Sequence, residues 1–446
     1  MRLWKKTFTP LVMLTLGLCL GSVANLFATQ AVAEPTTRAR NTDLERFLPN
    51  HGNSVYNASG LLRQWPAGGP KELWRVDIGW GKSAVVEADG LAFTATQTDK
   101  KQWALCLDPL TGSTRWKHLL HAKENRHVAR GPVTSPVVDG DRVYFIPYVI
   151  DKDVWDMHCP VICLKMTSGE ELWRLEKGVW ATEASTPLVV GNVLYVAADS
   201  TDRAILTALD KRTGAVHWTT RVPSDSKREL AAPSSLTYQI VEGIPQIVVA
   251  TYGTREILGI DARNGSIMWR YGYPAKFSVG LVSTPVAVEQ YLFLCAGEGK
   301  NKNFSTCFEM KAVNNTLTYR QVYYSTELQT NNYNTVAIYR DAIFGFGGQG
   351  SNGFIHCTDL HDGRLLWKQV AESWSKDQQL IIADDLMFAI SKQEELVLAK
   401  PSRAGYQELA RFPLNLDLGR PQQPTLANGR MYIRGKQSIA CYQLVP

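Results

Sequence analysis

The sequence predicts an all-β fold, an eight-bladed β-propeller, and three observations lead to it. A segment of the form small or apolar residue–x–Asp–x3–Gly–x3–Trp returns along the chain at intervals of 42 to 57 residues. Short runs rich in β-branched and aromatic residues, bounded by turn residues, surround each copy. The C-terminal segment 422–446 supplies only three such runs, and residues 72–76 near the other end supply a matching fourth. One blade built from both ends would close the ring and remove exposed sheet edges.

The repeated segment has a structural explanation. Glycine accepts the positive φ that a tight turn between the third and fourth strands needs, and aspartate can cap the amides of that turn. The tryptophan offers a large flat surface that can dock between neighbouring sheets. We therefore interpret the motif as architecture and expect no catalytic residue in it. The complete copies are Asp108, Gly112, Trp116; Asp210, Gly214, Trp218; Asp261, Gly265, Trp269; and Asp359, Gly363, Trp367. The partial copies are Lys165, Gly169, Trp173; the frame Lys311, Asn315, Tyr319; and Trp74 alone.

The repeats divide the chain into successive four-stranded units. Full units are expected at 83–120, 134–178, 185–223, 232–274, 283–325 and 334–373. A seventh, at 378–415, keeps the strand-like run Leu396-Val397-Leu398 but has no tryptophan. The eighth combines 422–446 with the strand around Trp74.

The N-terminus has the features of an export signal. Three basic residues precede an apolar run from Leu11 to Ala28, and Ala31-Val32-Ala33 offers a cleavage site of small residues. We expect a signal peptide at 1–33, a lead-in segment at 34–59 and a single propeller domain at 60–446, located in the periplasm or secreted. An uncleaved signal that serves as a membrane anchor is the alternative.

Charge and cysteine usage limit the classes of function. Removal of residues 1–33 leaves a net charge of about +3 with no run of like charge, which disfavours nucleic acid as a partner. The position two residues before the motif aspartate holds cysteine in some repeats and Ala208 or Gly259 in others, so we expect a small side chain there. The cysteines at this position are Cys106, Cys163, Cys357 and Cys441. A disulfide between Cys295 and Cys307 across a hairpin is the minor alternative.

The repeat resembles the pyrroloquinoline quinone-like (PQQ-like) propeller repeat, in the segment Ala104 to Trp116 and its copies over residues 60–446. The resemblance implies an eight-bladed propeller and one of two roles. Quinoprotein dehydrogenases bind the quinone with Ca²⁺ in the propeller channel, whereas proteins similar to the outer-membrane assembly factor BamB are non-catalytic scaffolds. The dehydrogenase group also carries a disulfide between adjacent cysteines, and this chain has no Cys-Cys pair. We therefore expect no cofactor and no metal.

A binding surface is expected on the face that carries the blade-connecting loops and the second-to-third hairpins. The hairpin at 146–160 is a long insertion with apolar residues near its tip, which either bind a partner or fold back onto the blade. Polar loop residues would surround the channel mouth. The candidate residues for a partner or ligand are Arg130, Trp155, Met157, Glu183, Asn331, Asn332 and Arg420.

The function expected from these observations is that of an exported, non-catalytic scaffold. It would be a monomer that binds another protein of the cell envelope. The alternatives are a PQQ- and calcium-dependent dehydrogenase and a propeller that binds a small ligand or glycan.

Overall fold

The structure is a computed structural model, and the part of the chain that it describes belongs to one compact unit. The chain divides into the units Met1–Arg40 and Asn41–Pro446, and the described residues all lie in the second. These residues are 52–446 without 123–130, 148, 152–155, 177–184, 198–203, 223–230, 233, 252, 274–282, 298–302, 327–334, 349–351, 376 and 420–421.

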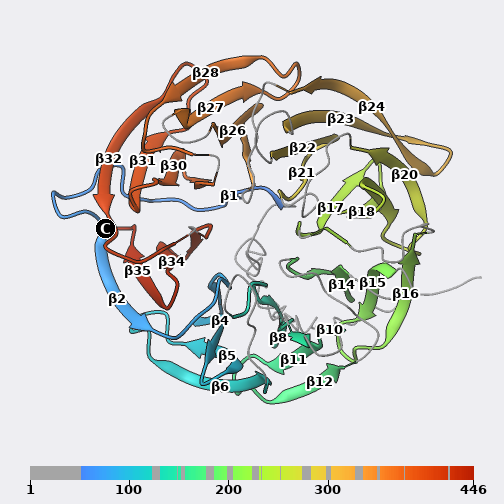
Figure 1. Cartoon of the computed structure of the whole chain (residues 1–446), viewed down its shortest axis with the longest axis horizontal. Coiled ribbons are helices and arrows are strands. Elements are labelled where there is room, and N and C mark those ends of the chain that lie inside the picture. The colour runs from blue at the N-terminus through green and yellow to red at the C-terminus, as the bar shows by residue number, and fades with distance from the viewer. Residues whose placement is uncertain are drawn as a thin grey trace, which may run out of the picture. The chain divides into compact units, whose positions relative to one another are not determined.

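Eight antiparallel sheets form the blades of a β-propeller, which confirms the fold class (Figure 1). We number the blades in chain order from the first complete one. Blade 1 comprises β3 (Val86–Ala88), β4 (Leu91–Thr98), β5 (Lys101–Leu107) and β6 (Thr114–His121). Blade 2 comprises β7 (Val137–Asp139), β8 (Arg142–Phe145), β11 (Val161–Lys165) and β12 (Glu171–Leu175). Blade 3 comprises β13 (Leu188–Val190), β14 (Val193–Ala197), β15 (Ala204–Asp210) and β16 (Val216–Arg221).

The remaining blades repeat this order, with the innermost strand first along the chain. Blade 4 comprises β17 (Thr237–Val241), β18 (Ile244–Ala250), β19 (Glu256–Asp261) and β20 (Ile267–Gly272). Blade 5 comprises β21 (Val286–Val288), β22 (Tyr291–Gly297), β23 (Asn303–Val313) and β24 (Thr316–Ser325). Blade 6 comprises β25 (Ala337–Tyr339), β26 (Ala342–Gly347), β27 (Phe354–Asp359) and β28 (Leu365–Val370). Blade 7 comprises β29 (Gln379–Ala383), β30 (Leu386–Ile390), β31 (Glu395–Lys400) and β32 (Gln407–Pro413).

Blade 8 joins the two ends of the propeller, as the sequence predicts. It comprises β33 (Thr425–Ala427), β34 (Arg430–Arg434), β35 (Ser438–Gln443) and the early strand β2 (Lys71–Asp77). β2 pairs antiparallel with β35, and Trp74 lies opposite Cys441. Because the outer strand comes from the start of the domain and the other three come from its end, the ring closes through backbone hydrogen bonds.

A short strand within the lead-in segment, β1 (Val55–Tyr56), has no counterpart in the sequence analysis. It pairs parallel with β29, the innermost strand of blade 7, and so lies on the channel side of that blade (Figure 1). Just before it, the Asn53 amide donates to the carbonyl of Ile338 in blade 6 at 2.8 Å and accepts from the N–H of the same residue at 2.9 Å. Residues 53–56 of the lead-in segment therefore lie along the inner strands of two neighbouring blades.

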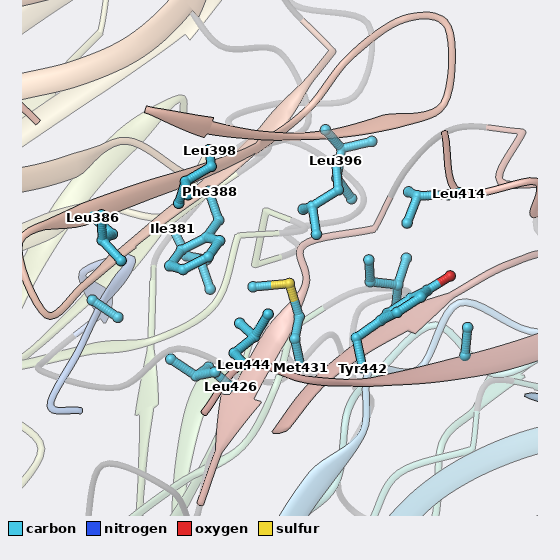
Figure 2. Close-up of a cluster of buried hydrophobic side chains, with 14 of the residues drawn as sticks. Ile381, Leu386, Phe388, Leu396, Leu398, Leu414, Leu426, Met431, Tyr442 and Leu444 are labelled. Atoms are coloured by element: carbon cyan, nitrogen blue, oxygen red, sulfur yellow. The ribbon is translucent and has the colours of Figure 1, made fainter. Parts of the chain in front are cut away.

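Apolar side chains fill the space between successive blades. Between blades 7 and 8, Phe388 and Leu398 face Met431 and Tyr442, and all four side chains are buried (Figure 2). Blade 7 thus forms a full core without a motif tryptophan, because its aliphatic strands supply the packing area instead. No helix within the described ranges is long and apolar enough to cross a membrane.

Candidate functional site

Four of the motif tryptophans dock on the motif glycines of the next blade. The Trp74 indole in blade 8 lies 2.7 Å from where a Cβ on Gly112 in blade 1 would stand, and its Nε1–H donates to the Pro109 carbonyl at 2.9 Å. Gly112 also has a φ of 71°. Glycine is needed there for two reasons, since a side chain would strain the turn and collide with the indole. The same packing joins Trp116 to Gly169, Trp173 to Gly214 and Trp218 to Gly265.

The motif aspartates cap the turn that carries these glycines. An Asp108 carboxylate oxygen accepts from the backbone N–H groups of Leu110 at 2.9 Å and Thr111 at 3.0 Å, and Arg115 donates to the other oxygen. Desolvation opposes ionisation of this carboxyl, but the hydrogen bonds outweigh it and lower the pKa of Asp108. Asp210 binds its own turn in the same way. Both carboxylates therefore serve to hold the backbone conformation of their turns.

The contact between blades 4 and 5 departs from this pattern. Trp269 donates from Nε1 to Gln246 within its own blade at 2.7 Å. A Cβ on Gly259 would lie only 1.9 Å from the Trp269 Nε1, so the absence of a side chain at Gly259 creates the space for the indole. Phe308 and Tyr319 of blade 5 then pack edge-on against the indole, at ring centroid distances of 6.4 and 5.4 Å.

Strand register also corrects which residue of blade 5 has the tryptophan position of the motif. The motif spacing predicts Tyr319 at that position. However, Cys307 has the position in blade 5 that Cys106 has in blade 1, and Cys307 pairs with Tyr323. The Tyr323 ring lies 2.6 Å from where a Cβ on Gly363 of blade 6 would stand, as a tryptophan would. The hairpin from β23 to β24 is lengthened and turns at Asn314 and Asn315, whose φ values are 50° and 60°. Tyr323 is thus the docking residue.

The seven cysteines outside the predicted signal are all buried. Cys106, for example, lies between Phe93 and Trp116 in the ladder, where a larger side chain would not fit. Burial raises the pKa of the Cys106 thiol to about 12. Cys295 lies opposite Ser305, and Cys307 opposite Phe293, so the two cysteines are not a directly opposed pair that a disulfide would join.

A buried charge cluster holds blade 8 against blade 1. The Glu87 side chain on β3 has no exposed surface, and it accepts hydrogen bonds from Arg430, Tyr432 and, at 2.8 Å, the Asn428 amide. Burial raises the pKa of Tyr432, and the Glu87 charge raises it further, so the phenol stays protonated as a donor. The sequence signal for this cluster is the acidic residue inside the apolar run of residues 84–88.

Arg434, on the same strand as Arg430, fastens the loop between blades 8 and 1. Its guanidinium donates to the backbone carbonyls of Gly81 at 3.2 Å and Gly79 at 2.9 Å. Within the described ranges no carboxylate pairs with it, and burial lowers the pKa of Arg434 to about 9. The closing blade therefore depends on one buried ion pair and one buried cation bound by carbonyl groups.

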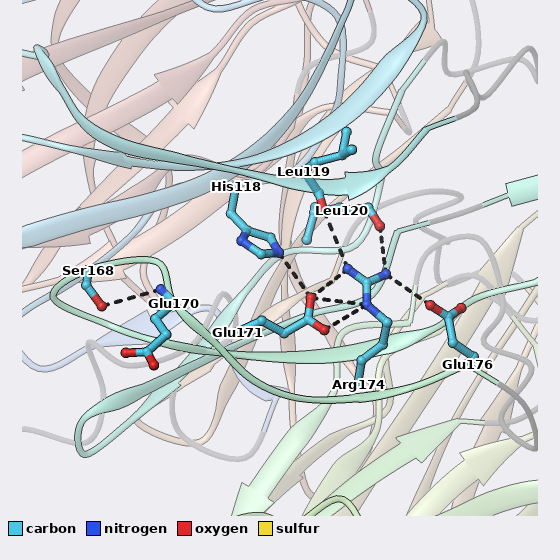
Figure 3. Close-up of polar contacts among 8 residues, drawn as sticks. All are labelled: His118, Leu119, Leu120, Ser168, Glu170, Glu171, Arg174 and Glu176. Atoms are coloured by element: carbon cyan, nitrogen blue, oxygen red, sulfur yellow. Dashed lines mark hydrogen bonds and ion pairs between the residues drawn. The ribbon is translucent and has the colours of Figure 1, made fainter.

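Polar contacts cover the outer edge between blades 1 and 2. Glu171 on β12 lies 3.1 Å from the His118 Nε2 on β6 and 2.7 Å from Arg174 (Figure 3). Arg174 also donates to the Leu120 carbonyl of blade 1 at 3.1 Å. Between blades 5 and 6, by contrast, the outer strands leave a cavity of about 480 Å³.

Most of the residues that the sequence analysis proposed for binding lie outside the described residues. These are Arg130, Trp155, Glu183, Asn331, Asn332 and Arg420. Met157 lies in β10 (Asp156–His158), which pairs with β9 (Val149–Asp151) as a separate two-stranded hairpin. The insertion at 146–160 therefore contains a hairpin, and the involvement of its tip in binding stays a prediction.

The quinone alternative requires a divalent cation held by several oxygen ligands. In the part of the chain that the structure describes, no three His, Cys, Asp or Glu side chains gather as a metal site. The buried carboxylate of Glu87 is already bound by Arg430 and Tyr432. We assign no chemistry to a quinone and calcium site.

The eight blades and their Trp–Gly docking contacts define a β-propeller that is similar to those built from PQQ-like repeats. Within that class the chain is similar to BamB: a family model described as outer membrane protein assembly factor BamB matches residues 154–369. Among curated protein sequences, none matches this chain.

Several solved structures are similar to this chain. The crystal structure of BamB from Moraxella catarrhalis is 13% identical, with a TM-score of 0.58 over 84% of this chain and 97% of that one. The Dos1 propeller is 9% identical, with a TM-score of 0.57 over 84% of this chain and 95% of that one. Quinohemoprotein alcohol dehydrogenase from Comamonas testosteroni is 11% identical over 92% of this chain and 82% of that one, with a TM-score of 0.46. At these identities the likeness to BamB and to the Dos1 propeller establishes the fold alone.

Proposed function

We propose that the protein is a non-catalytic scaffold of the bacterial cell envelope that binds a component of the machinery for outer-membrane protein assembly. The family model for the assembly factor BamB supports the kind of partner. The position of the lead-in segment supports a role that does not use the channel for chemistry. We further propose that residues 1–33 direct export and that the chain acts as a monomer in the periplasm, either free or held by its signal.

The lead-in segment carries this proposal. β1 pairs with the inner edge of β29, and Asn53 hydrogen-bonds to Ile338 at the inner edge of blade 6. The side chain of Tyr56 is 4% exposed, so this segment is packed in place. It takes up space on the channel side of two blades, where a channel cofactor would need room. We therefore place the proposed partner on the face that carries the blade-connecting loops rather than in the channel.

The proposal is tested by loss of the protein in the cell. If it scaffolds assembly, a strain without it will contain less folded β-barrel protein in its outer membrane, measured as the fraction that resists unfolding in detergent before heating. The double variant Trp155→Ala and Met157→Ala should reproduce part of that loss. Leu110→Ala is the matched control, because Leu110 is an equally apolar, 63% exposed residue on the opposite face of the propeller.

A dehydrogenase would give a different result. Titration of the purified protein with PQQ and Ca²⁺ would then raise the melting temperature in a saturable manner, since a ligand at a hundred times its Kd adds about 2.7 kcal/mol of stability. The scaffold proposal expects no such shift. A calcium-dependent shift, together with normal outer-membrane proteins in the deletion strain, would replace the scaffold with an enzyme.

A further inference from the structure

Residues 52–56 of the lead-in segment, which we call the inner segment, lie against blades that are complete without them. The sheet of blade 7 contains β1 as a fifth strand, whereas within the described residues the sheets of the other blades have four strands each (Figure 1). Blades 6 and 7 both have their four strands without the inner segment. The inner segment is therefore an addition to finished sheet edges, which is how many domains bind an extended peptide.

The direction of β1 shows how the inner segment runs. β1 is parallel to β29, which follows a blade-connecting loop and ends at the hairpin that contains Asp384. After β1, the Leu61 N–H donates to the Asp384 Oδ2 at 2.8 Å, so the chain leaves the channel at that hairpin. At the other end, Gly52 lies beside Thr237 and Pro285, where the inner strands of blades 4 and 5 begin. The inner segment thus passes along the channel in an extended conformation.

Asn53 is recognised through both polar atoms of its amide. The Asn53 Nδ2 donates to the Ile338 carbonyl at 2.8 Å, and the Oδ1 accepts from the Ile338 N–H at 2.9 Å. The amide therefore takes the place of a strand partner on the inner edge of β25. An aspartate could not do so at neutral pH, because an ionised carboxylate has no proton to donate to the carbonyl.

The residues on either side of Asn53 are also held specifically. Gly52 has a φ of 91°, and a Cβ there would lie 3.0 Å from the Thr237 Oγ1, so glycine is favoured. The Ser54 side chain has no exposed surface, and the Ser54 carbonyl accepts from the Ile382 N–H at 2.9 Å. The Tyr56 side chain lies in the core between blades 7 and 8. Four of the five positions are thus selected by their surroundings.

The groups that hold the inner segment are uncharged. They are the backbone of Ile338, the backbone of Ile382, the Thr237 side chain beside Gly52 and the apolar core around Tyr56. A charged side chain at these positions would lose its hydration without gaining a counter-charge. An occupant of this place must therefore be a neutral peptide.

The inner segment is connected to the propeller by exposed residues. Asn57, Ser59 and Gly60 are exposed, and nothing lies within 4 Å of the Cβ position of Gly60. The backbone ladder with β29 includes only Val55 and Tyr56. A separate peptide with the same residues would make the same contacts. The advantage of the inner segment is then its effective concentration, which is on the order of millimolar for a short flexible linker.

We propose that the inner edges of blades 6 and 7 form a binding groove for a neutral, extended peptide of a partner protein, and that the inner segment fills this groove until the peptide displaces it. The peptide would carry asparagine after glycine and before serine, and tyrosine three positions after the asparagine, as residues 52–56 do. This groove lies in the channel and is separate from the loop face, so its test is independent of the proposed role in assembly.

The test is titration of the purified protein with a fluorescent peptide of residues 50–59. The wild-type protein should bind this peptide weakly, because its own inner segment competes. Asn53→Ala removes two buried hydrogen bonds from the inner segment but not from the peptide. This variant should therefore bind the peptide saturably and at least tenfold more tightly than the wild-type protein does.

Two altered peptides test the specificity of the groove. A peptide with Asn53→Ala should bind the Asn53→Ala protein at least tenfold less tightly than the wild-type peptide, since neither can then bind the Ile338 backbone through an amide. A peptide with Ser59→Ala, changed at an exposed position, is the matched control and should bind like the wild-type peptide. Equal affinity of all three peptides, or no saturable binding of the wild-type peptide to the Asn53→Ala protein, would overturn the proposal.

Thermal melting separates filling of the groove from general stabilisation. The wild-type peptide should raise the melting temperature of the Asn53→Ala protein towards that of the wild-type protein. Gly259→Ala is the matched control, because it crowds the Trp269 indole in blade 4 and leaves the inner segment unchanged. The peptide should not raise its melting temperature. An equal rise in both variants would contradict a specific groove.

Hydrogen exchange of the wild-type protein provides a test that needs no variant. The Ile382 N–H donates to the Ser54 carbonyl, and the Ile338 N–H donates to Asn53. If the inner segment can leave the groove, both amides should exchange through local opening, faster than the amides of β31, which pair within blade 7. Exchange of both amides only through global unfolding would show that the inner segment is a fixed part of the propeller, and would refute displacement.

Discussion

Glu87 and Arg430 are 343 residues apart in the chain, and they form a buried ion pair where blade 8 meets blade 1. The Arg430 guanidinium donates to both carboxylate oxygens of Glu87, which has no exposed side-chain surface. Arg430 stands on the strand next to β35, the strand that pairs with β2. The ion pair therefore strengthens the junction next to the one that closes the ring by backbone pairing.

Replacement of Glu87 by glutamine should destabilise the propeller strongly. The change leaves the Arg430 cation without its counter-charge inside the protein, and loss of one partner of a buried ion pair costs roughly 3–5 kcal/mol. The measurement is the free energy of unfolding in urea. Glu309→Gln is the control: its partner Arg320 is 67% exposed, and a surface pair contributes about 0–1 kcal/mol. Similar losses in both variants would show that the buried pair has no special role in closure.

Deletion of residues 70–79 should give an aggregating or unfolded product. These residues contain β2, and without β2 the β35 edge would be exposed and the Trp74 indole would be lost from Gly112. Recovery of soluble protein and its thermal melting report the outcome. Lys71→Ala, at the exposed start of the same strand, should melt normally. A deletion variant with unchanged melting would refute the closure model.

Substitution of Gly259 by alanine should cost about 1–3 kcal/mol, the usual range for overpacking a core. The new methyl group would stand 1.9 Å from the Trp269 Nε1, and that indole is confined by Phe308 and Tyr319. Gly272→Ala on the neighbouring strand is the control, because nothing lies within 4 Å of its Cβ position. Chemical denaturation of the two variants, with little change expected for Gly272→Ala, makes the comparison.

Stability should fall between pH 6.5 and pH 4 because of His356. Burial lowers the pKa of His356 from 6.5 to about 4, so in this range the unfolded chain binds a proton that the folded protein does not. The free energy of unfolding then decreases by up to roughly 3 kcal/mol as the pH falls, and is unaffected by this residue above pH 6.5. Urea unfolding of the wild-type protein at several pH values measures the slope.

The variant His356→Gln should have a flatter pH dependence in that range, whatever its stability at pH 7. His217→Gln, at a side chain that is 45% exposed, is the matched control. An unchanged slope in His356→Gln would mean that His356 titrates normally and that its surroundings are open to solvent.

Much of the fold could be predicted from the repeated motif because each copy acts locally. The spacing from Asp108 through Gly112 to Trp116 sets one turn and the strand after it, and the structure has four strands in every predicted unit. The motif spacing predicted the wrong docking residue in blade 5, because the hairpin from β23 to β24 is lengthened. Asn315 has the φ expected of a motif glycine, but the register shows that Tyr323, not Tyr319, docks on the next blade.

The polar clusters could not be predicted because their members are brought together only by the closed ring. Glu87 and Arg430 show no relation in sequence. The short strand β1 has too few residues to show a periodic pattern, and its pairing with β29 depends on the completed propeller.

The sequence by itself determined the β-class, the eight units, the turn residues and the closure of the ring, because a motif repeated in register encodes each blade through short-range contacts. The tertiary structure decided which aromatic side chain docks at each junction, which buried charges meet, and where polar groups remain without partners. Those outcomes depend on the spacing between neighbouring sheets, which no single repeat contains. Contacts such as that between Glu87 and Arg430 form only when the first and last blades lie side by side.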